Sequence, residues 1–356
     1  SDLLQFTARK IKFQWNNRIR GNSVFRRFSC SRVRSRFFNL KHQNIIMPNS
    51  IQFIPDFSNK ILNVVSVLTN QNNWGISFVG ADLAWPHSKG EDVTVAVIDT
   101  GWTNHKDLLS NFKAGYDATG NNDFIDRGNF HGTHVAGIIA SNCGNENGTM
   151  GIAPMAKLVP IKALNDDGSG SFDFIINALK IALDVDVDIV NMSLGTTIAP
   201  HNNEVHNLIK QLTEKGKIVI CAAGNDGGEV NFPAKYDESV AVAAVEHTGT
   251  LAKFSSRGPE LDIAAPGVQI YSTWGDGRYI MLDGTSMACP CISGVVALIV
   301  SWYKKHPELN FSINQQNITR LLHSLGDADG QNIIQAGQYN IGVPKFCNFN
   351  WGGPIA

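Results

Sequence analysis

Cysteine is scarce in this chain of 356 residues, which contains six. Cys289 and Cys291 lie two positions apart in an apolar run, a spacing that does not suit a disulfide bond. Cys221 lies in an apolar, strand-like segment, where a free thiol packs as a small hydrophobe. The pattern argues against a disulfide-rich secreted domain and favours a reducing compartment, so we expect a cytoplasmic protein.

Long apolar runs are also missing. The N-terminal segment has no continuous apolar core of the kind that a secretory signal needs, and we expect no run long enough to span a membrane. Charged residues make up only 17% of the chain and hydrophobic ones 43%. The chain is therefore able to bury a sizeable core, and we expect one large globular domain with appendages.

Positive and negative charges are distributed unevenly, although the formal net charge is −1. Residues 1–46 contain eleven Lys and Arg against Asp2, which leaves 19 basic and 30 acidic residues from Met47 onward. The basic segment has three explanations: a transit peptide, which would make the location organellar, a nucleic-acid-binding arm, or sequence upstream of a start at Met47. We interpret residues 1–46 as a disordered leader. The acidic remainder argues against a nucleic-acid partner.

From Val93 onward, short β-branched runs alternate with amphipathic helical patterns. The runs expected to form buried strands cover residues 93–98, 158–161, 189–192, 218–221 and 240–245. The expected helices carry apolar stripes over residues 175–183 and 205–212. This alternation predicts an α/β fold, a three-layer, doubly wound and mostly parallel sheet with right-handed crossovers.

Three polar motifs occur in the order Asp, His, Ser. Asp99 ends a strand-like run, His131 opens the segment His-Gly-Thr-His, and Ser286 lies between small residues at the start of an apolar helical run. Each motif alone has an ordinary explanation as a turn residue, a helix start or a helix cap. A fourth segment, ending in Asn225, follows another apolar strand. Four such segments in one chain point to a common site.

These residue types are suited to nucleophilic catalysis. A serine hydroxyl is a poor nucleophile at neutral pH, so Ser286 needs a nearby base, and an imidazole has a suitable pKa. We assign that role to His131, with Asp99 bonded to its far side to orient the ring. The amide of Asn225 and the backbone N–H of Ser286 would bind the oxygen that becomes negative during the attack.

The four segments resemble the signature of subtilisin-like serine proteases over about residues 74–325, and the intracellular subtilisins most closely. The resemblance implies a serine endopeptidase of broad specificity that acts on polypeptides, with a peptidase domain at residues 74–342. It also implies that His131 is the base and His134 a core residue, a choice that their spacing alone does not make. Residues 343–356 are either a tail or a homodimer contact. The alternative function is a catalytically silent, peptide-binding or structural protein with the subtilisin fold.

The resemblance also implies a groove for an extended substrate. Its two edges would be Gly168, Ser169, Gly170 and Ser193, Leu194, Gly195. Ala222, Ala223 and Gly224 would line the first specificity pocket, with Asn231 near its base and Asp226 at its rim. A second, apolar pocket would consist of Leu164, Phe172, Ile175 and Leu194. We expect large apolar substrate residues to be preferred before the scissile bond. The Asp226 carboxylate would also favour Lys and Arg at this position.

A structural Ca²⁺ ion is expected at a loop that matches the calcium loop of the family but is one residue longer. The implied ligands are Asp107, Asn145, Asn147 and Thr149, whose oxygen atoms suit Ca²⁺. An ordinary polar surface loop is the alternative. A second, weaker cation site is expected near Ala234, Tyr236 and Asp262.

Residues 47–73 resemble the N-terminal extension of intracellular subtilisins, whose corresponding segment blocks the active site. Here the blocking segment is Ile51–Phe57, in which Pro55 lacks an N–H and has a fixed φ. Asp56 stands where an aromatic residue is usual in the family, and Cys291 stands where His is common. We expect cleavage within residues 61–75 to activate the enzyme.

Overall fold

The computed structural model describes residues 51–52, 73–143, 148–327, 333–336 and 339–351. The chain divides into two units, residues 1–47 and 48–356. The expected leader, residues 1–46, lies outside the described residues, as does most of the expected extension.

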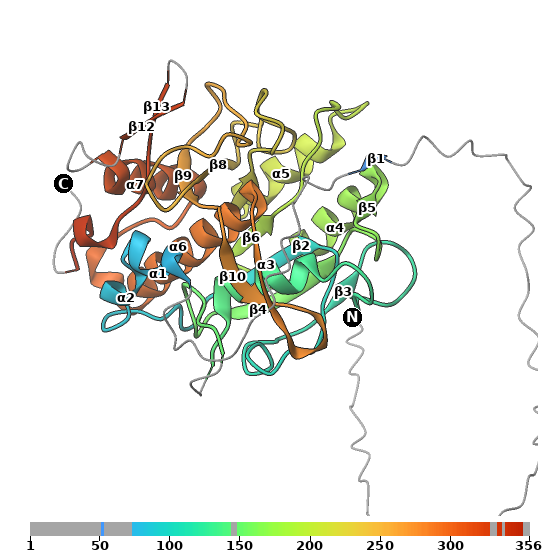
Figure 1. The fold of residues 1–356 in the computed structure, drawn as a ribbon, viewed down its shortest axis with the longest axis horizontal. Coiled ribbons are helices and arrows are strands. Elements are labelled where there is room, and N and C mark those ends of the chain that lie inside the picture. The colour runs from blue at the N-terminus through green and yellow to red at the C-terminus, as the bar shows by residue number, and fades with distance from the viewer. Residues whose placement is uncertain (1–50, 53–72, 144–147, 328–332, 337–338, 352–356) are drawn as a thin grey trace, which may run out of the picture. The chain divides into compact units, whose positions relative to one another are not determined.

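A central sheet of nine strands organises the described part of the second unit (Figure 1). Its order is β12-β13-β9-β8-β7-β6-β2-β4-β3, and all neighbours from β13 to β3 are parallel. The strands are β2 (Thr94–Asp99), β3 (Tyr116–Asp117), β4 (Lys157–Lys162), β6 (Ile189–Met192), β7 (Ile218–Ala222), β8 (Val240–Val245), β9 (Ile263–Pro266), β12 (Ile333–Ala336) and β13 (Tyr339–Gly342). Only β12 and β13 pair antiparallel within this sheet. The predicted mostly parallel α/β fold is confirmed.

Helices cover both faces of the sheet, because its strands are apolar on both sides. In β2, Val95 and Val97 belong to one core cluster, and Ala96 and Ile98 belong to the other. The first cluster contains residues of α1 (Trp74–Val79), α2 (Ala81–Ala84), α3 (His131–Ala140), α6 (Thr285–Lys305) and α7 (Gln315–Asp327). The second contains residues of α4 (Phe172–Asp184) and α5 (Glu204–Glu214), on the opposite side of the sheet in Figure 1. The result is the expected three-layer arrangement.

Helix α6 runs through the core and begins at the candidate nucleophile. It has 21 residues, and an 18-residue window within it has a mean hydropathy of 1.7, so by length and composition it could cross a membrane. The expectation that no such run exists was therefore wrong. The whole apolar window is buried inside the protein, which identifies α6 as a core helix. Cys289 and Cys291 lie on it, and burial raises the pKa of the Cys291 thiol to about 12.

The segment after β13 packs on the domain. Val343, Phe346 and Phe349 are buried, and the Phe346 and Phe349 rings belong to the cluster that contains α6. The Trp351 ring stacks on the His87 ring with centroids 4.6 Å apart. Residues 343–351 therefore pack on the core of the second unit, and the expected domain boundary at 342 stays a prediction.

Two short antiparallel pairs lie outside the main sheet. β10 (Ile270–Thr273) and β11 (Tyr279–Leu282) form a hairpin just before α6, with the 3-10 turn η1 (Gly275–Gly277) between them. β1 (Ile51–Gln52) pairs with β5 (Ser169–Gly170), which is one of the two expected groove edges. The remaining 3-10 turns are η2 (Pro307–Leu309) and η3 (Phe346–Asn348).

Candidate active site

The candidate catalytic residues lie at the ends of regular elements. Asp99 is the last residue of β2, His131 the first of α3 and Ser286 the second of α6. Open parallel sheets place their sites at the carboxyl ends of strands, which is where Asp99 lies. All three residues are buried, so charges in the site act in a low dielectric.

Asp99 and His131 are joined directly. Nδ1 of His131 lies 2.8 Å from Oδ1 of Asp99, and the same oxygen accepts a hydrogen bond of 2.7 Å from the Thr100 N–H. An ionised carboxylate only accepts hydrogen bonds, so this contact places a proton on Nδ1 and makes Nε2 the basic nitrogen. Asp99 is fully buried and His131 is 3% exposed, which strengthens the bond.

Ser286 is placed by the start of α6. Its hydroxyl donates to the backbone oxygen of Ser193 at 3.0 Å, which ties the candidate nucleophile to a groove segment. The hydroxyl has one proton, so while this contact holds, the proton is directed to Ser193 and is not available to a base.

The Asn225 side chain is held in one orientation. Its Oδ1 accepts hydrogen bonds of 2.8 Å from both the N–H and the hydroxyl of Thr285. Its buried Nδ2 has no hydrogen-bond partner among the described residues. A Cβ atom placed on Gly284 would lie 3.4 Å from this Nδ2 and 3.6 Å from the Ser286 nitrogen. Two N–H groups therefore border one small space, which suits an oxygen that carries negative charge.

His134 is a packed core residue, as expected. Its Nε2 lies 3.2 Å from the backbone oxygen of Ile280. Burial, with repulsion from His131, lowers the pKa of His134 to about 3, so the ring is neutral at physiological pH.

Comparison with known proteins agrees with this geometry. A sequence profile of the subtilase family, peptidase S8, matches residues 90–331, more than half of the chain. The chain belongs to the subtilase family. The major intracellular serine protease of Bacillus subtilis is 39% identical over 270 residues, which cover 72% of this chain and 82% of the relative.

Two further relatives have similar identity. The thermostable alkaline protease of Halalkalibacterium halodurans is 38% identical over 271 residues, which cover 74% of this chain and 72% of the relative. Thermitase of Thermoactinomyces vulgaris is 36% identical over 234 residues, or 65% of this chain and 83% of the relative. This subtilase is a subtilisin-type serine endopeptidase, as the resemblance implied.

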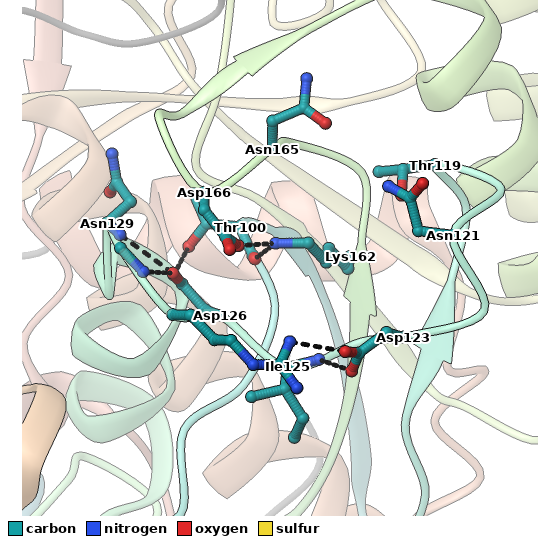
Figure 2. Close-up of polar contacts among 12 residues, drawn as sticks. Thr100, Thr119, Asn121, Asp123, Ile125, Asp126, Asn129, Lys162, Asn165 and Asp166 are labelled. Carbon is teal, nitrogen blue, oxygen red and sulfur yellow. Dashed lines mark hydrogen bonds and ion pairs between the residues drawn. The ribbon is translucent and has the colours of Figure 1, made fainter.

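The loop before His131 is organised by Asp126, a residue not predicted from the sequence. Its buried carboxylate accepts hydrogen bonds from the Thr100 hydroxyl and from the backbone N–H groups of Gly128, Asn129 and Phe130 (Figure 2). Burial raises the pKa of Asp126 in spite of these bonds. The signal was present, because a carboxylate shortly before Gly-Asn is typical of a side chain that caps a turn.

The two groove segments lie where an extended peptide would have access to them. Gly168 has a positive φ of 80°, and Ser169 and Gly170 form β5. Ser193, Leu194 and Gly195 directly follow β6, and the backbone oxygen of Ser193 accepts the bond from Ser286. Of the two segments expected to form groove edges, the one that contains β5 pairs with the chain's own β1.

A pocket opens beside the space that borders Asn225. Its cavity volume is about 30 Å³, and its lining consists of Leu194, Gly195, Ala222, Gly224, Asn225, Asn231 and Thr285. Ala223 is fully buried and does not line this pocket. Asp226 is exposed, also outside the lining, and accepts a hydrogen bond of 2.8 Å from the Ser256 hydroxyl. Leu164, Ile175 and Leu194 belong to one core cluster, with Phe172 packed against it.

Two of the four expected calcium ligands lie together. Oδ2 of the buried Asp107 accepts hydrogen bonds from the Thr149 N–H at 3.1 Å and from the Tyr279 hydroxyl at 2.8 Å. Burial, followed by this bond to Asp107, raises the pKa of Tyr279. Asn145 and Asn147 lie outside the described residues. Within the described part, no three His, Cys, Asp or Glu residues form a cluster that could hold a metal.

The weaker cation site has one carboxylate, Asp262, which already has partners within the protein. Its Oδ2 accepts a hydrogen bond of 2.8 Å from the Ala241 N–H, and its Oδ1 lies 3.6 Å from Nε2 of His323.

Proposed function

We propose that this subtilase cleaves peptide bonds through Ser286, His131 and Asp99, with Asn225 and the Ser286 N–H as the oxyanion hole. The observation that carries the proposal is the 2.8 Å bond between Asp99 and His131, and it is supported by an Asn225 amide whose Nδ2 has no partner among the described residues. Peptide binding alone would need neither feature.

The reaction has two halves. Ser286 Oγ attacks the carbonyl carbon of the scissile bond while His131 Nε2 takes the hydroxyl proton, and the carbonyl oxygen becomes negative in the space beside Gly284. His131 then gives that proton to the leaving amine, and the C–N bond breaks to leave an acyl ester on Ser286. Water then attacks the ester while His131 takes its proton; the bond between the acyl carbon and Ser286 Oγ breaks, His131 returns the proton to Oγ, and the acid is released. Asp99 stabilises the imidazolium in both halves and keeps its own negative charge.

Covalent labelling with a serine-directed phosphonate tests the assignment. We expect the label on Ser286 and no label in the Ser286→Ala variant. In His131→Ala, labelling should be slower by orders of magnitude, because the nucleophile has lost its base. A folded protein without label at Ser286, after removal of its N-terminal segment, would favour the silent, peptide-binding alternative.

We also propose that the N-terminal extension inhibits the enzyme. Ile51 and Gln52 are the register partners of Gly170 and Ser169, so this part of the chain adds an antiparallel strand to a groove edge. An extended substrate uses the same free edge by β-augmentation. Substrate and extension therefore compete for one set of backbone groups, and removal of the extension activates the enzyme.

We propose that the enzyme accepts many different substrate residues immediately before the scissile bond, with a preference for large apolar ones. The lining of the pocket beside Asn225 includes Leu194, Ala222 and the amide of Asn231, and the exposed Asp226 lies outside that lining. Apolar side chains gain from burial at this position. Equal cleavage after Gly and Phe in a peptide series would contradict the assignment of this pocket.

Ca²⁺ is proposed as a structural ion. The proposal is supported by the contact between the Thr149 N–H and the Asp107 carboxylate, which brings two of the implied ligand residues together, and by the amide and backbone oxygens that the nearby loop supplies in sequence. The ion would hold this loop against the start of the domain and would take no part in the chemistry.

An intracellular location is proposed on the basis of the thiols. Cys221, Cys289 and Cys291 are buried without disulfide bonds, and two relatives are named as intracellular serine proteases. Cell fractionation with an antibody to the domain tests this location, and recovery mainly outside the cell would contradict it.

A further inference from the structure

One buried cation next to the proposed triad has no role in the proposed mechanism. Lys162 ends β4, and its Cα is the register partner of Asp99 in β2. Its side chain is only 6% exposed, yet a lysine in the last position of an apolar strand is usually solvated. The position of Lys162 therefore calls for a specific explanation.

The ammonium group of Lys162 has two short contacts. Its Nζ donates to the backbone oxygen of Thr100 and to Oδ1 of Asp166, at 2.6 Å each (Figure 2). Short bonds from a charged donor are the strong class of hydrogen bond. The side-chain stem also packs against the turn after Asp99, because a Cβ atom on Gly101 would lie 3.3 Å from Lys162 Cγ and Cδ.

Thr100 transmits this contact to the proposed dyad. Its N–H donates to Asp99, and its hydroxyl accepts from the Gly132 N–H in the first turn of α3. The same hydroxyl donates to Asp126, which holds the loop before His131. The N–H, the hydroxyl and the carbonyl of Thr100 are thus all hydrogen-bonded, and Lys162 is the residue that binds the carbonyl oxygen.

We propose that Lys162, held by Asp166, is a positioning residue that fixes the Asp99–Gly101 turn and so keeps Asp99 in bonding geometry with His131. This inference rests on the proposed triad. Loss of the ammonium would free the Thr100 carbonyl and let the turn shift, and a shift of about 1 Å in such a group costs on the order of 10² in rate. The substrate would still bind, because Lys162 does not line the pocket beside Asn225.

The test is the kinetics of Lys162→Ala, with active sites counted by the phosphonate. We expect kcat to fall about 10- to 100-fold, with KM for a short peptide anilide changed less than about threefold. A cavity of about 170 Å³, lined in part by Lys162 and Asp166, opens at this position. Added propylammonium should therefore restore part of kcat, whereas tetramethylammonium, which has no N–H, should not.

Lys217→Ala is the matched control. Lys217 is also buried, and its Nζ donates to the backbone oxygens of Ala182 and Val185 at the end of α4, away from the triad. Loss of the Lys217 ammonium should lower the melting temperature and leave kcat within about twofold of the value for the unaltered enzyme. A Lys162→Ala enzyme that matches this control in kcat would overturn the proposal.

Two further variants keep the test decisive if Lys162→Ala does not fold. Lys162→Met fills the same space without the donor, and Asp166→Asn weakens the partner at a side chain that is 43% exposed. Both should lose kcat at nearly constant KM, and full activity in either one would refute the positioning role. Failure to label Ser286 in the otherwise unaltered protein, after removal of its N-terminal segment, would instead refute the triad itself.

Discussion

Thr285 holds the Asn225 side chain with both its backbone N–H and its hydroxyl, at 2.8 Å each. An amide that accepts two hydrogen bonds at its oxygen has its NH₂ group turned the other way. The orientation of the proposed oxyanion donor is therefore fixed before a substrate arrives, which is what electrostatic preorganisation requires.

Removal of the Asn225 donor should reduce kcat far more than KM. We expect Asn225→Ala to lose about 10²–10³ in kcat, the magnitude established for one oxyanion donor in subtilisin itself. Thr285→Val keeps the backbone donor and loses the hydroxyl, so a loss of about 1 kcal/mol, or roughly fivefold, is expected. Steady-state kinetics with an anilide substrate measures both.

Thr285→Ser is the control, because it keeps both hydrogen bonds to Asn225 and should have the activity of the unaltered enzyme. A Thr285→Ser enzyme as impaired as Thr285→Val would refute this explanation.

Gly284 should tolerate no side chain. Its φ is 157°, and a Cβ there would occupy the space between the Asn225 Nδ2 and the Ser286 nitrogen. Gly284→Ala should therefore lose about as much kcat as Asn225→Ala. Gly216→Ala is the control for backbone strain, because Gly216 has a φ of 79° and no atom near its missing Cβ. Equal kcat in the two glycine variants would show that the space is not an oxyanion site.

The depressed pKa of His134 should make the fold sensitive to acid. The folded protein takes up this proton only near pH 3, while the unfolded chain takes it up near pH 6.5. Below pH 6.5 the unfolded state binds more protons, so stability is lost as the pH falls from about 6.5 towards 3. One group contributes at most about 1.4 kcal/mol per pH unit.

Urea denaturation of the Ser286→Ala protein at several pH values measures this effect without self-digestion. His134→Gln retains a donor for the Ile280 carbonyl and does not titrate, so its stability should depend less on pH over this range. If the free energy of unfolding falls equally with pH in the proteins with and without His134→Gln, His134 is not a neutral, buried residue.

Much of the fold could be predicted because its strands are apolar on both faces. The run 240–245 has this character, and the observed β8 has the same bounds. The Asp, His and Ser motifs could be found because each stands at the end of a regular element. Thr100, Asp126 and Lys162 were missed for a physical reason: their roles depend on contacts across the fold, such as the pairing of β2 with β4, which no local pattern encodes. The bond from Ser256 to Asp226, which spans thirty residues, could not be predicted for the same reason.

Removal of the N-terminal extension should strengthen peptide binding. In the Ser286→Ala background, deletion of residues 1–72 keeps Asn73, whose side chain caps α1. We expect a peptide ligand to bind at least tenfold more tightly to this protein than to the full chain, because β1 no longer competes with the peptide for the groove edge. Calorimetry measures both affinities. Gln52→Pro removes an N–H from β1 and should give part of the gain, whereas Gln52→Ala should give none. Equal affinity in the full and shortened proteins would contradict inhibition by this segment.

Withdrawal of Ca²⁺ should destabilise the domain if Asp107 is a ligand. An ion present at 100 times its dissociation constant adds about 2.7 kcal/mol to folding, so a chelator should lower the melting temperature of the Ser286→Ala protein by several degrees. Asp107→Asn removes the carboxylate charge and should abolish the response to the chelator. Tyr279→Phe removes only the hydroxyl that donates to Asp107 and should retain the response. A melting temperature that the chelator does not change would remove the ion from this site and leave residues 142–149 as a polar loop.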